Sequence, residues 1–121
     1  MDERKQDIGN PLTRIVRKDL GITHNDFSRI YPRLCKDWGE TIGLTADIEM
    51  LTDYHPSIAL QTTNNLTGSK IFVKVSEERV RKVGSLKFPY VDLVFWFSGI
   101  SETEVDHFMG RFDMAFQKGG G

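Results

Sequence analysis

The sequence predicts an α+β domain: two N-terminal helices, an antiparallel sheet of about four strands in meander order, and an amphipathic C-terminal helix. Three observations support this fold class. Apolar residues recur at helical spacing near both ends of the chain, and they alternate with polar residues in the middle. No helical pattern separates the predicted strands, so consecutive strands are expected to pair antiparallel.

Length and composition fit one domain with a single core. The chain has 121 residues, of which we expect 10–118 to form the domain and 1–9 and 119–121 to be flexible ends. Cys35 is the only cysteine, which excludes an internal disulfide and fits a reducing compartment. No apolar stretch is long enough to cross a bilayer and no apolar signal opens the chain, so we expect a soluble, cytoplasmic protein.

The first predicted helix begins with Asn10 as its N-cap and Pro11 at its first position. Gly21 is well placed to end it. Its apolar stripe, at helical spacing, consists of Leu12, Ile15, Val16 and Leu20.

A second helix is predicted to follow at once. Thr23 and Asp26 have the spacing of a capping box. Pro32 lies inside the pattern, so we expect a kink or a break near Tyr31. The apolar stripe of this helix consists of Phe27, Ile30, Tyr31, Leu34 and Trp38.

The middle of the chain reads as strands. Alternation predicts strands over 46–54, 56–63 and 71–75, and residues 77–83 either continue the third strand or bulge away from it. The strongest strand pattern covers 88–97. One face of that strand carries Val91, Leu93, Phe95 and Phe97, and the other carries Tyr90, Asp92, Val94 and Trp96.

The C-terminal helix has the clearest start signal in the chain. Ser101 and Glu104 form a capping box, and a broad apolar face follows. This strand and capped helix, from Val91 to Phe116, are similar to the end of the ferredoxin-like anticodon-binding domains of phenylalanyl-tRNA synthetases. The pattern is shared by many α+β domains, so no function is carried over from the resemblance.

No catalytic, cofactor or metal site is predicted. The three histidines and Cys35 stand singly, without the paired spacing of zinc ligands. Cys35 lies on a helical stripe and is expected to be a small core residue. Asp92 is the one acid flanked by large apolar residues, and we expect it to pair with a base such as Lys74 on a neighbouring strand.

Charge is segregated along the chain although the net charge is only -1. Five acids and no base lie between residues 37 and 69, whereas residues 70–87 hold six bases and two acids. These segments either make a surface with two oppositely charged regions or pair across neighbouring strands. The first option supports a nucleic-acid-binding module that uses Lys70, Lys74, Arg79, Arg81 and Lys82, with Phe72 or Tyr90 as a stacking platform.

The leading hypothesis is a non-enzymatic interaction or regulatory adaptor module. If the helices cover one face of the sheet, the aromatic side chains on the other face are available to a protein partner or a homodimer. The alternative is that the N-terminal helices cover this face in a three-layer sandwich. A small-ligand-binding subunit or an enzyme is the third class. The predicted partner-binding face consists of Phe72, Lys74, Tyr90, Asp92, Val94 and Trp96.

Overall fold

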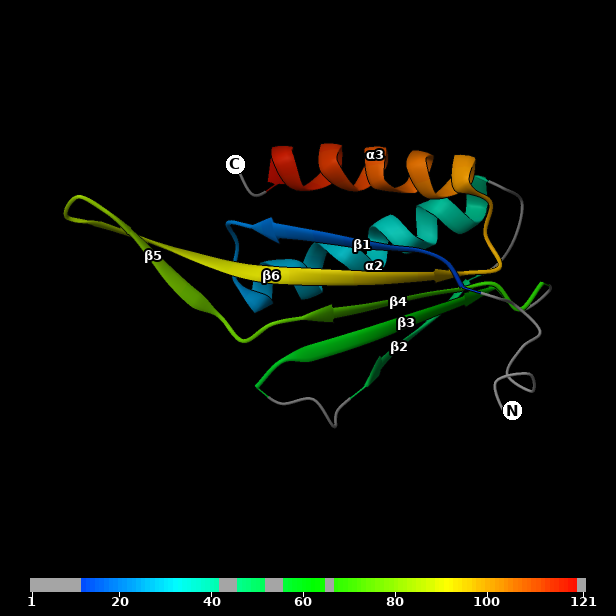
Figure 1. Cartoon of the computed structure of the whole chain (residues 1–121), viewed down its shortest axis with the longest axis horizontal. Helices are drawn as coiled ribbons and strands as arrows, with labels where there is room; N and C mark the ends of the chain where they lie inside the picture. Colours follow the sequence, from blue (N-terminus) through cyan, green and yellow to red (C-terminus); the bar gives the residue numbers. More distant parts are fainter. Residues whose placement is uncertain (1–11, 42–45, 52–55, 65–66, 120–121) are drawn as a thin grey trace.

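The computed structural model describes residues 12–41, 46–51, 56–64 and 67–119, and it confirms the α+β class. Figure 1 shows two helices on one side of an antiparallel sheet. None of the described helices is long and apolar enough to cross a membrane. In chain order the elements are β1 (Leu12–Leu20), α2 (His24–Thr41), β2 (Ala46–Leu51), β3 (Ile58–Asn64), β4 (Lys70–Val75), β5 (Arg79–Val83), β6 (Leu86–Ser98) and α3 (Glu102–Gly119).

Within the described residues the sheet has six strands rather than about four, in the order β1-β6-β4-β3-β2, and β5 pairs with the first part of β6. All pairs are antiparallel. Strands β2, β3 and β4 follow the predicted meander, and β6 then pairs with both β4 and β5. Because β1 pairs with the last strand instead of the second, the whole sheet is not a pure meander.

The prediction of a first helix over residues 12–20 was wrong, because this segment is strand β1. Its apolar spacing fits a helix, but its pairing with β6 decides the conformation, with Ile15 opposite Trp96 and Val16 opposite Phe95. The two neighbours therefore point to opposite faces of the sheet. Asn10 and Pro11, taken as the start of that helix, lie outside the described residues.

Helix α2 runs through Pro32, so of the kink or break expected near Tyr31 the break does not occur. Its start is as predicted, since the Asp26 amide donates to Thr23 Oγ1 at 3.1 Å. Tyr31 and the rest of the apolar stripe pack against the sheet, and this burial outweighs the lost hydrogen bond at the proline. Because residues 12–20 form strand β1, the described part of the chain has one N-terminal helix instead of two.

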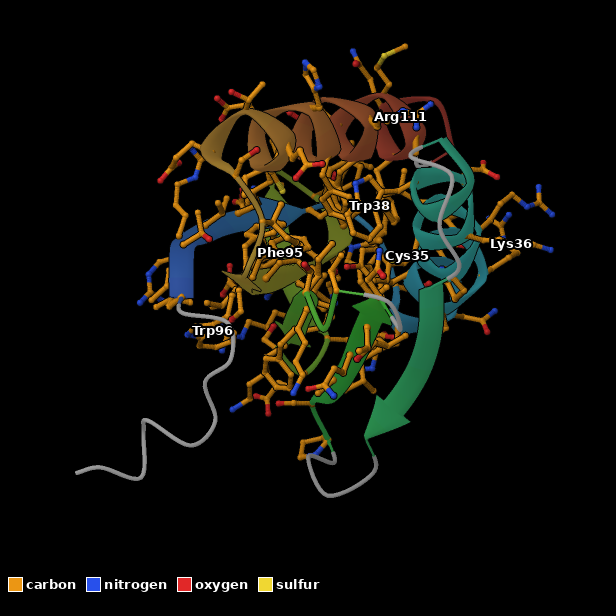
Figure 2. All side chains as sticks on the ribbon, turned by 90° about the vertical axis from the view of Figure 1, so that its right-hand side faces the viewer. Cys35, Lys36, Trp38, Phe95, Trp96 and Arg111 are labelled. Atoms are coloured by element: carbon orange, nitrogen blue, oxygen red, sulfur yellow. The ribbon has the colours of Figure 1, made fainter. Side chains whose placement is uncertain are left out.

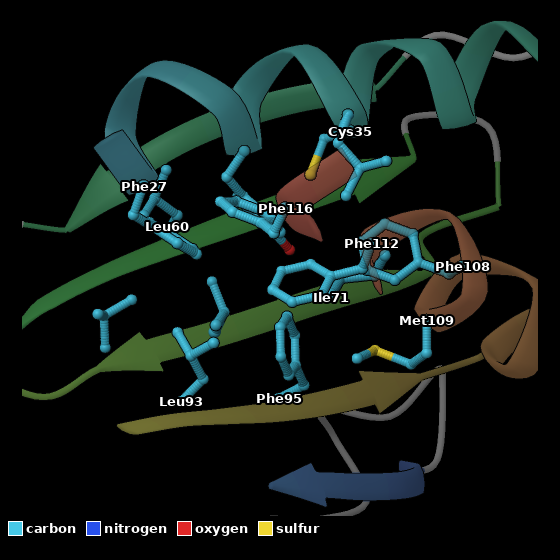
Figure 3. Packing of buried hydrophobic residues seen from close by; sticks show 14 of the residues in the cluster. Phe27, Cys35, Leu60, Ile71, Leu93, Phe95, Phe108, Met109, Phe112 and Phe116 are labelled. Atoms are coloured by element: carbon cyan, nitrogen blue, oxygen red, sulfur yellow. The ribbon is translucent and has the colours of Figure 1, made fainter. Parts of the chain in front are cut away.

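One core lies between the helices and the sheet (Figure 3). Phe27 and Tyr31 from α2 stack at 4.8 Å between ring centroids, and Phe95 from β6 meets Phe112 from α3 edge-on at 5.2 Å. Both helices thus cover the same face of the sheet. The described chain is a two-layer structure, and the three-layer alternative was wrong.

Candidate interaction surface

The face of the sheet turned away from the helices carries an apolar strip across three strands. Trp96 stands at its centre, with Ile15 of β1 opposite on one side and Phe72 of β4 opposite on the other. The rings of Phe72 and Trp96 lie 5.2 Å apart. Figure 2 shows Trp96 on the side of the sheet away from Phe95 and the helices. We call Ile15, Phe72, Val94 and Trp96 the open face.

The side chains of the open face are partly accessible, in contrast to those on the helix side of the same strands. Ile15 is 42 % exposed, and Phe72, Val94 and Trp96 are half-buried. A large aromatic side chain in this position is partly shielded from water in the free chain. It would be shielded fully when a partner packs against it.

Charged groups of both signs border the open face. Asp92 is bound by Arg79, and Asp19 by Arg81 at 3.2 Å. Asp92 therefore pairs with a base, as expected, and the ion pair is with Arg79 from β5. The guanidinium of Arg81 also lies 4.4 Å from the ring centroid of Tyr90. One face of the predicted Tyr90 stacking platform is therefore already occupied.

Among the described strands, the acidic segment pairs with the basic segment through β3 and β4, but this pairing places no acid opposite a base. Strand β2, which lies in the acidic segment, is separated from β4 by β3, and β3 carries no charged residue. The bases Arg79 and Arg81 pair instead with acids of β6 and β1.

Strands β5 and β6 continue the sheet into a projecting hairpin, residues 79–90, which we call the arm (Figure 1). Both options considered for residues 77–83 occur, because the chain bulges after Val75 and then resumes pairing with β6. Val75 lies opposite Leu93 and Arg79 opposite Tyr90, so the β4–β5 side contains one extra residue. Beyond Leu20, β1 no longer accompanies β6.

Hydrogen bonds connect the bulge to the rest of the sheet and to the start of α2. The Asp92 amide donates to Ser76 Oγ at 2.9 Å, and the Ser76 amide donates to the Asp92 carbonyl at 2.8 Å. His24 Nε2 donates to the Ser76 carbonyl at 2.6 Å, while the His24 amide donates to the Glu78 carboxylate at 2.8 Å. The carboxylate thus satisfies an amide at the start of α2, where negative charge is favourable.

The arm is exposed on both faces. Of the seven exposed large apolar residues in the described chain, four belong to it. Register places Val83, Leu86 and Phe88 on the same face as Arg79, Arg81 and Tyr90, whereas Val80, Lys82, Lys87 and Pro89 lie on the other face.

A hollow of about 490 Å³ lies on the helix side, between Trp38 and the outer surface of α3. Its described lining residues include neither a cysteine nor a hydroxyl side chain that could serve as a nucleophile. Its lining consists of Trp38, Glu104, Asp106, His107, Gly110, Arg111 and Met114.

Cys35 is a buried core residue, as predicted. Burial raises the pKa of its thiol to about 11, although Thr62 Oγ1 donates to Sγ at 3.3 Å. Burial also raises the pKa of Tyr31 well above its usual value, with Cys35 beside it as a smaller cause. A thiol with this pKa is protonated at neutral pH and is a poor nucleophile.

Within the described ranges, no three His, Cys, Asp or Glu side chains gather in a way that could hold a metal ion. His24 is used at the bulge and His107 is exposed on α3, while His55 lies outside the described residues. No protein-family model, curated protein or solved structure matches this chain.

The structure divides both predicted sets of site residues. Five members of the predicted face lie together on the sheet, and Tyr90 lies at the base of the arm. Among the predicted basic residues, Lys70 and Lys74 belong to β4, and Arg79, Arg81 and Lys82 belong to the arm.

Sequence reasoning missed Ile15, Val83, Leu86, Lys87 and Phe88. The alternation of residues 86–90 signals a strand, but it gives no sign that this strand leaves the body.

Proposed function

We propose that this chain is a non-enzymatic protein-interaction module that binds its partner through the open face. The observation that carries the proposal is the position of Trp96. It lies half-buried between Ile15 and Phe72 on a face that neither described helix covers. Tryptophan is enriched among the residues that dominate binding energy at protein interfaces.

The charges around the open face favour a protein over a polyanion as its partner. Asp19 and Asp92 lie on this face, where they pair with Arg81 and Arg79 respectively. A phosphate that approached this face would therefore meet two carboxylates. An apolar centre with a rim of mixed charge is typical of protein interfaces.

We further propose that the partner is a second copy of the chain, packed sheet on sheet. An interface between two identical faces has to complement itself, and charged residues on such a face can pair across the two copies when both signs are present. The open face meets this condition, with Arg17 beside Asp19 on β1 and Asp92 next to Val94 on β6. Packing of two such sheets would bury Trp96 and Phe72 of both copies.

Sedimentation velocity over micromolar to millimolar concentration tests this proposal. We expect a dimer that Trp96→Glu converts to a monomer with an unchanged far-ultraviolet circular dichroism spectrum. Ile15→Glu, at a more exposed position of the same face, should have the same effect and covers the case in which Trp96→Glu fails to fold. Met114→Glu is the matched control, because Met114 is 63 % exposed on α3.

A wild-type chain that stays monomeric throughout would overturn self-association through the open face. Equal dissociation by Met114→Glu would also overturn it, because the effect would then follow from added charge and not from the face that carries it.

A further inference from the structure

We propose that the arm is a nucleic-acid-binding element that enters the major groove of duplex DNA, separately from the interface on the open face. Residues 79–90 contain four bases and no acid. Acids of the body pair with Arg79 and Arg81, so Lys82 and Lys87 are the cations of the arm that have no ion-pair partner among the described residues.

Lys82 and Lys87 lie directly opposite each other in the β5–β6 register. Two like charges in this arrangement repel and destabilise the hairpin. Within the part of the chain that the structure describes, neither lysine has an ion-pair partner. A phosphate group between or beside the two ammonium groups would turn this repulsion into attraction.

The shape of the arm matches a groove in nucleic acid better than a flat surface. It is a ribbon of two strands with five residue pairs, open on both faces and along both edges. At the rise of a β-strand, five pairs extend about 16 Å. The major groove of B-DNA is about 12 Å wide and admits a two-stranded ribbon.

Other occupants fit the arm less well. Pairing with the arm of a second copy would bring together two ribbons that each carry Lys82 and Lys87 without an acid among the described residues to balance them. Insertion into a bilayer would rest on Val83 and Leu86, the only large apolar residues between the lysine pair and the turn. These two side chains bury less surface than a single myristoyl chain, whose membrane attachment is already marginal.

The experiment is a fluorescence anisotropy titration of a labelled duplex DNA oligonucleotide with the full chain at several salt concentrations. We expect affinity to fall steeply with salt. Lys82→Glu/Lys87→Glu should weaken binding by about tenfold or more and reduce the salt slope by about one for each lost phosphate contact. The matched control, Arg33→Glu/Lys36→Glu, makes the same change in net charge on the outer surface of α2, where Lys36 points away from the body (Figure 2).

Retained binding by the control together with loss in the arm variant supports the proposal, provided that both variants melt cooperatively near the wild-type temperature. Absence of duplex binding at low salt, or equal loss in both variants, overturns it. Polyglutamate or vesicles containing phosphatidylserine serve as competitors. If either displaces the DNA at the same charge concentration as unlabelled duplex, the arm is a general polyanion or lipid site and the proposal fails.

Discussion

The two faces of strand β6 have similar apolar content but very different surroundings. Val91, Leu93, Phe95 and Phe97 are at most 1 % exposed, whereas Asp92, Val94 and Trp96 on the other face are only half-buried. The difference arises because α2 and α3 both pack on the first face. In sequence, the two faces look like the two sides of a strand buried in a three-layer fold.

Strand β6 shows that an apolar face of a strand is not necessarily covered by the described helices of the same chain. The first face is explained by folding, since its side chains fill the core. For the second face, neither described helix supplies a cover, so its aromatic residues need another explanation. This difference is the reason for proposing an interface there.

The largest expected effect tests the two faces directly. Phe95→Ala should lower the free energy of unfolding by about 3 to 5 kcal/mol, because it opens a cavity in a packed aromatic core. Phe95 contacts Tyr31, Phe108 and Phe112 through their rings. Trp96→Ala should cost clearly less in the monomer, because part of that side chain already contacts water.

Urea unfolding at low protein concentration measures both losses under conditions that disfavour association. An equal or greater loss for Trp96→Ala would contradict the difference between the two faces, because Trp96 would then behave as a core residue and the open face would not be open.

The next largest expected effect is a fall in the free energy of unfolding at alkaline pH. It arises at Cys35, in the core between the helices and the sheet. An unfolded Cys35 loses its proton near its ordinary pKa of 9.0, whereas the folded thiol keeps it up to about 11. Between these values the unfolded chain binds fewer protons, so stability falls as pH rises. Two pKa units correspond to about 2 to 3 kcal/mol.

The difference in urea midpoint between wild type and Cys35→Ala, followed from pH 7 upward, separates this contribution from that of the lysines and includes the smaller part of the Tyr31 pKa shift that Cys35 causes. The variant should start less stable, and the gap should narrow as pH rises from about 9 to 11. A constant gap would mean that the thiol is accessible to water and that the covered face is less tightly closed than its packing implies.

Local patterns predicted the elements whose signals are local. The capping box at Ser101 is present, with the Glu104 amide donating to Ser101 Oγ at 3.1 Å. Alternation likewise identified β4 and most of β6. Strand β1 was missed because the spacing of its apolar residues also fits a helix. Its partner lies on β6, far away in the sequence, so no local window contains the pairing that decides between the two conformations.

The candidate surfaces were predictable to the same extent. Alternation along β6 placed Trp96 and Val94 on one face and Phe95 on the other, and both placements hold. The contribution of Ile15 could not be predicted, because it requires β1 to be a strand beside β6. The arm depends on where β1 stops accompanying β6 and on a one-residue bulge, and neither has a signature in composition.

The smallest expected effect is a loss of stability at the junction between the two parts of β6, one of which lies in the body and the other in the arm. Ser76→Ala removes the hydroxyl that accepts from the Asp92 amide at the junction between them. The loss of one hydrogen bond should lower the free energy of unfolding by about 1 kcal/mol. The effect should be local, because the bulge also keeps its contacts with His24.

Hydrogen exchange followed by NMR provides the discriminating measurement, since it reports on each amide separately. In Ser76→Ala the Asp92 amide should exchange faster. The exchange rate of the Phe95 amide in the body should change only as far as the global free energy of unfolding changes. Ser101→Ala makes the same chemical change at the start of α3 and should leave Asp92 protected. If both variants accelerate Asp92 equally, exchange there occurs by global unfolding. The bulge would then not be a separate joint, and the arm would be as firmly held as the body.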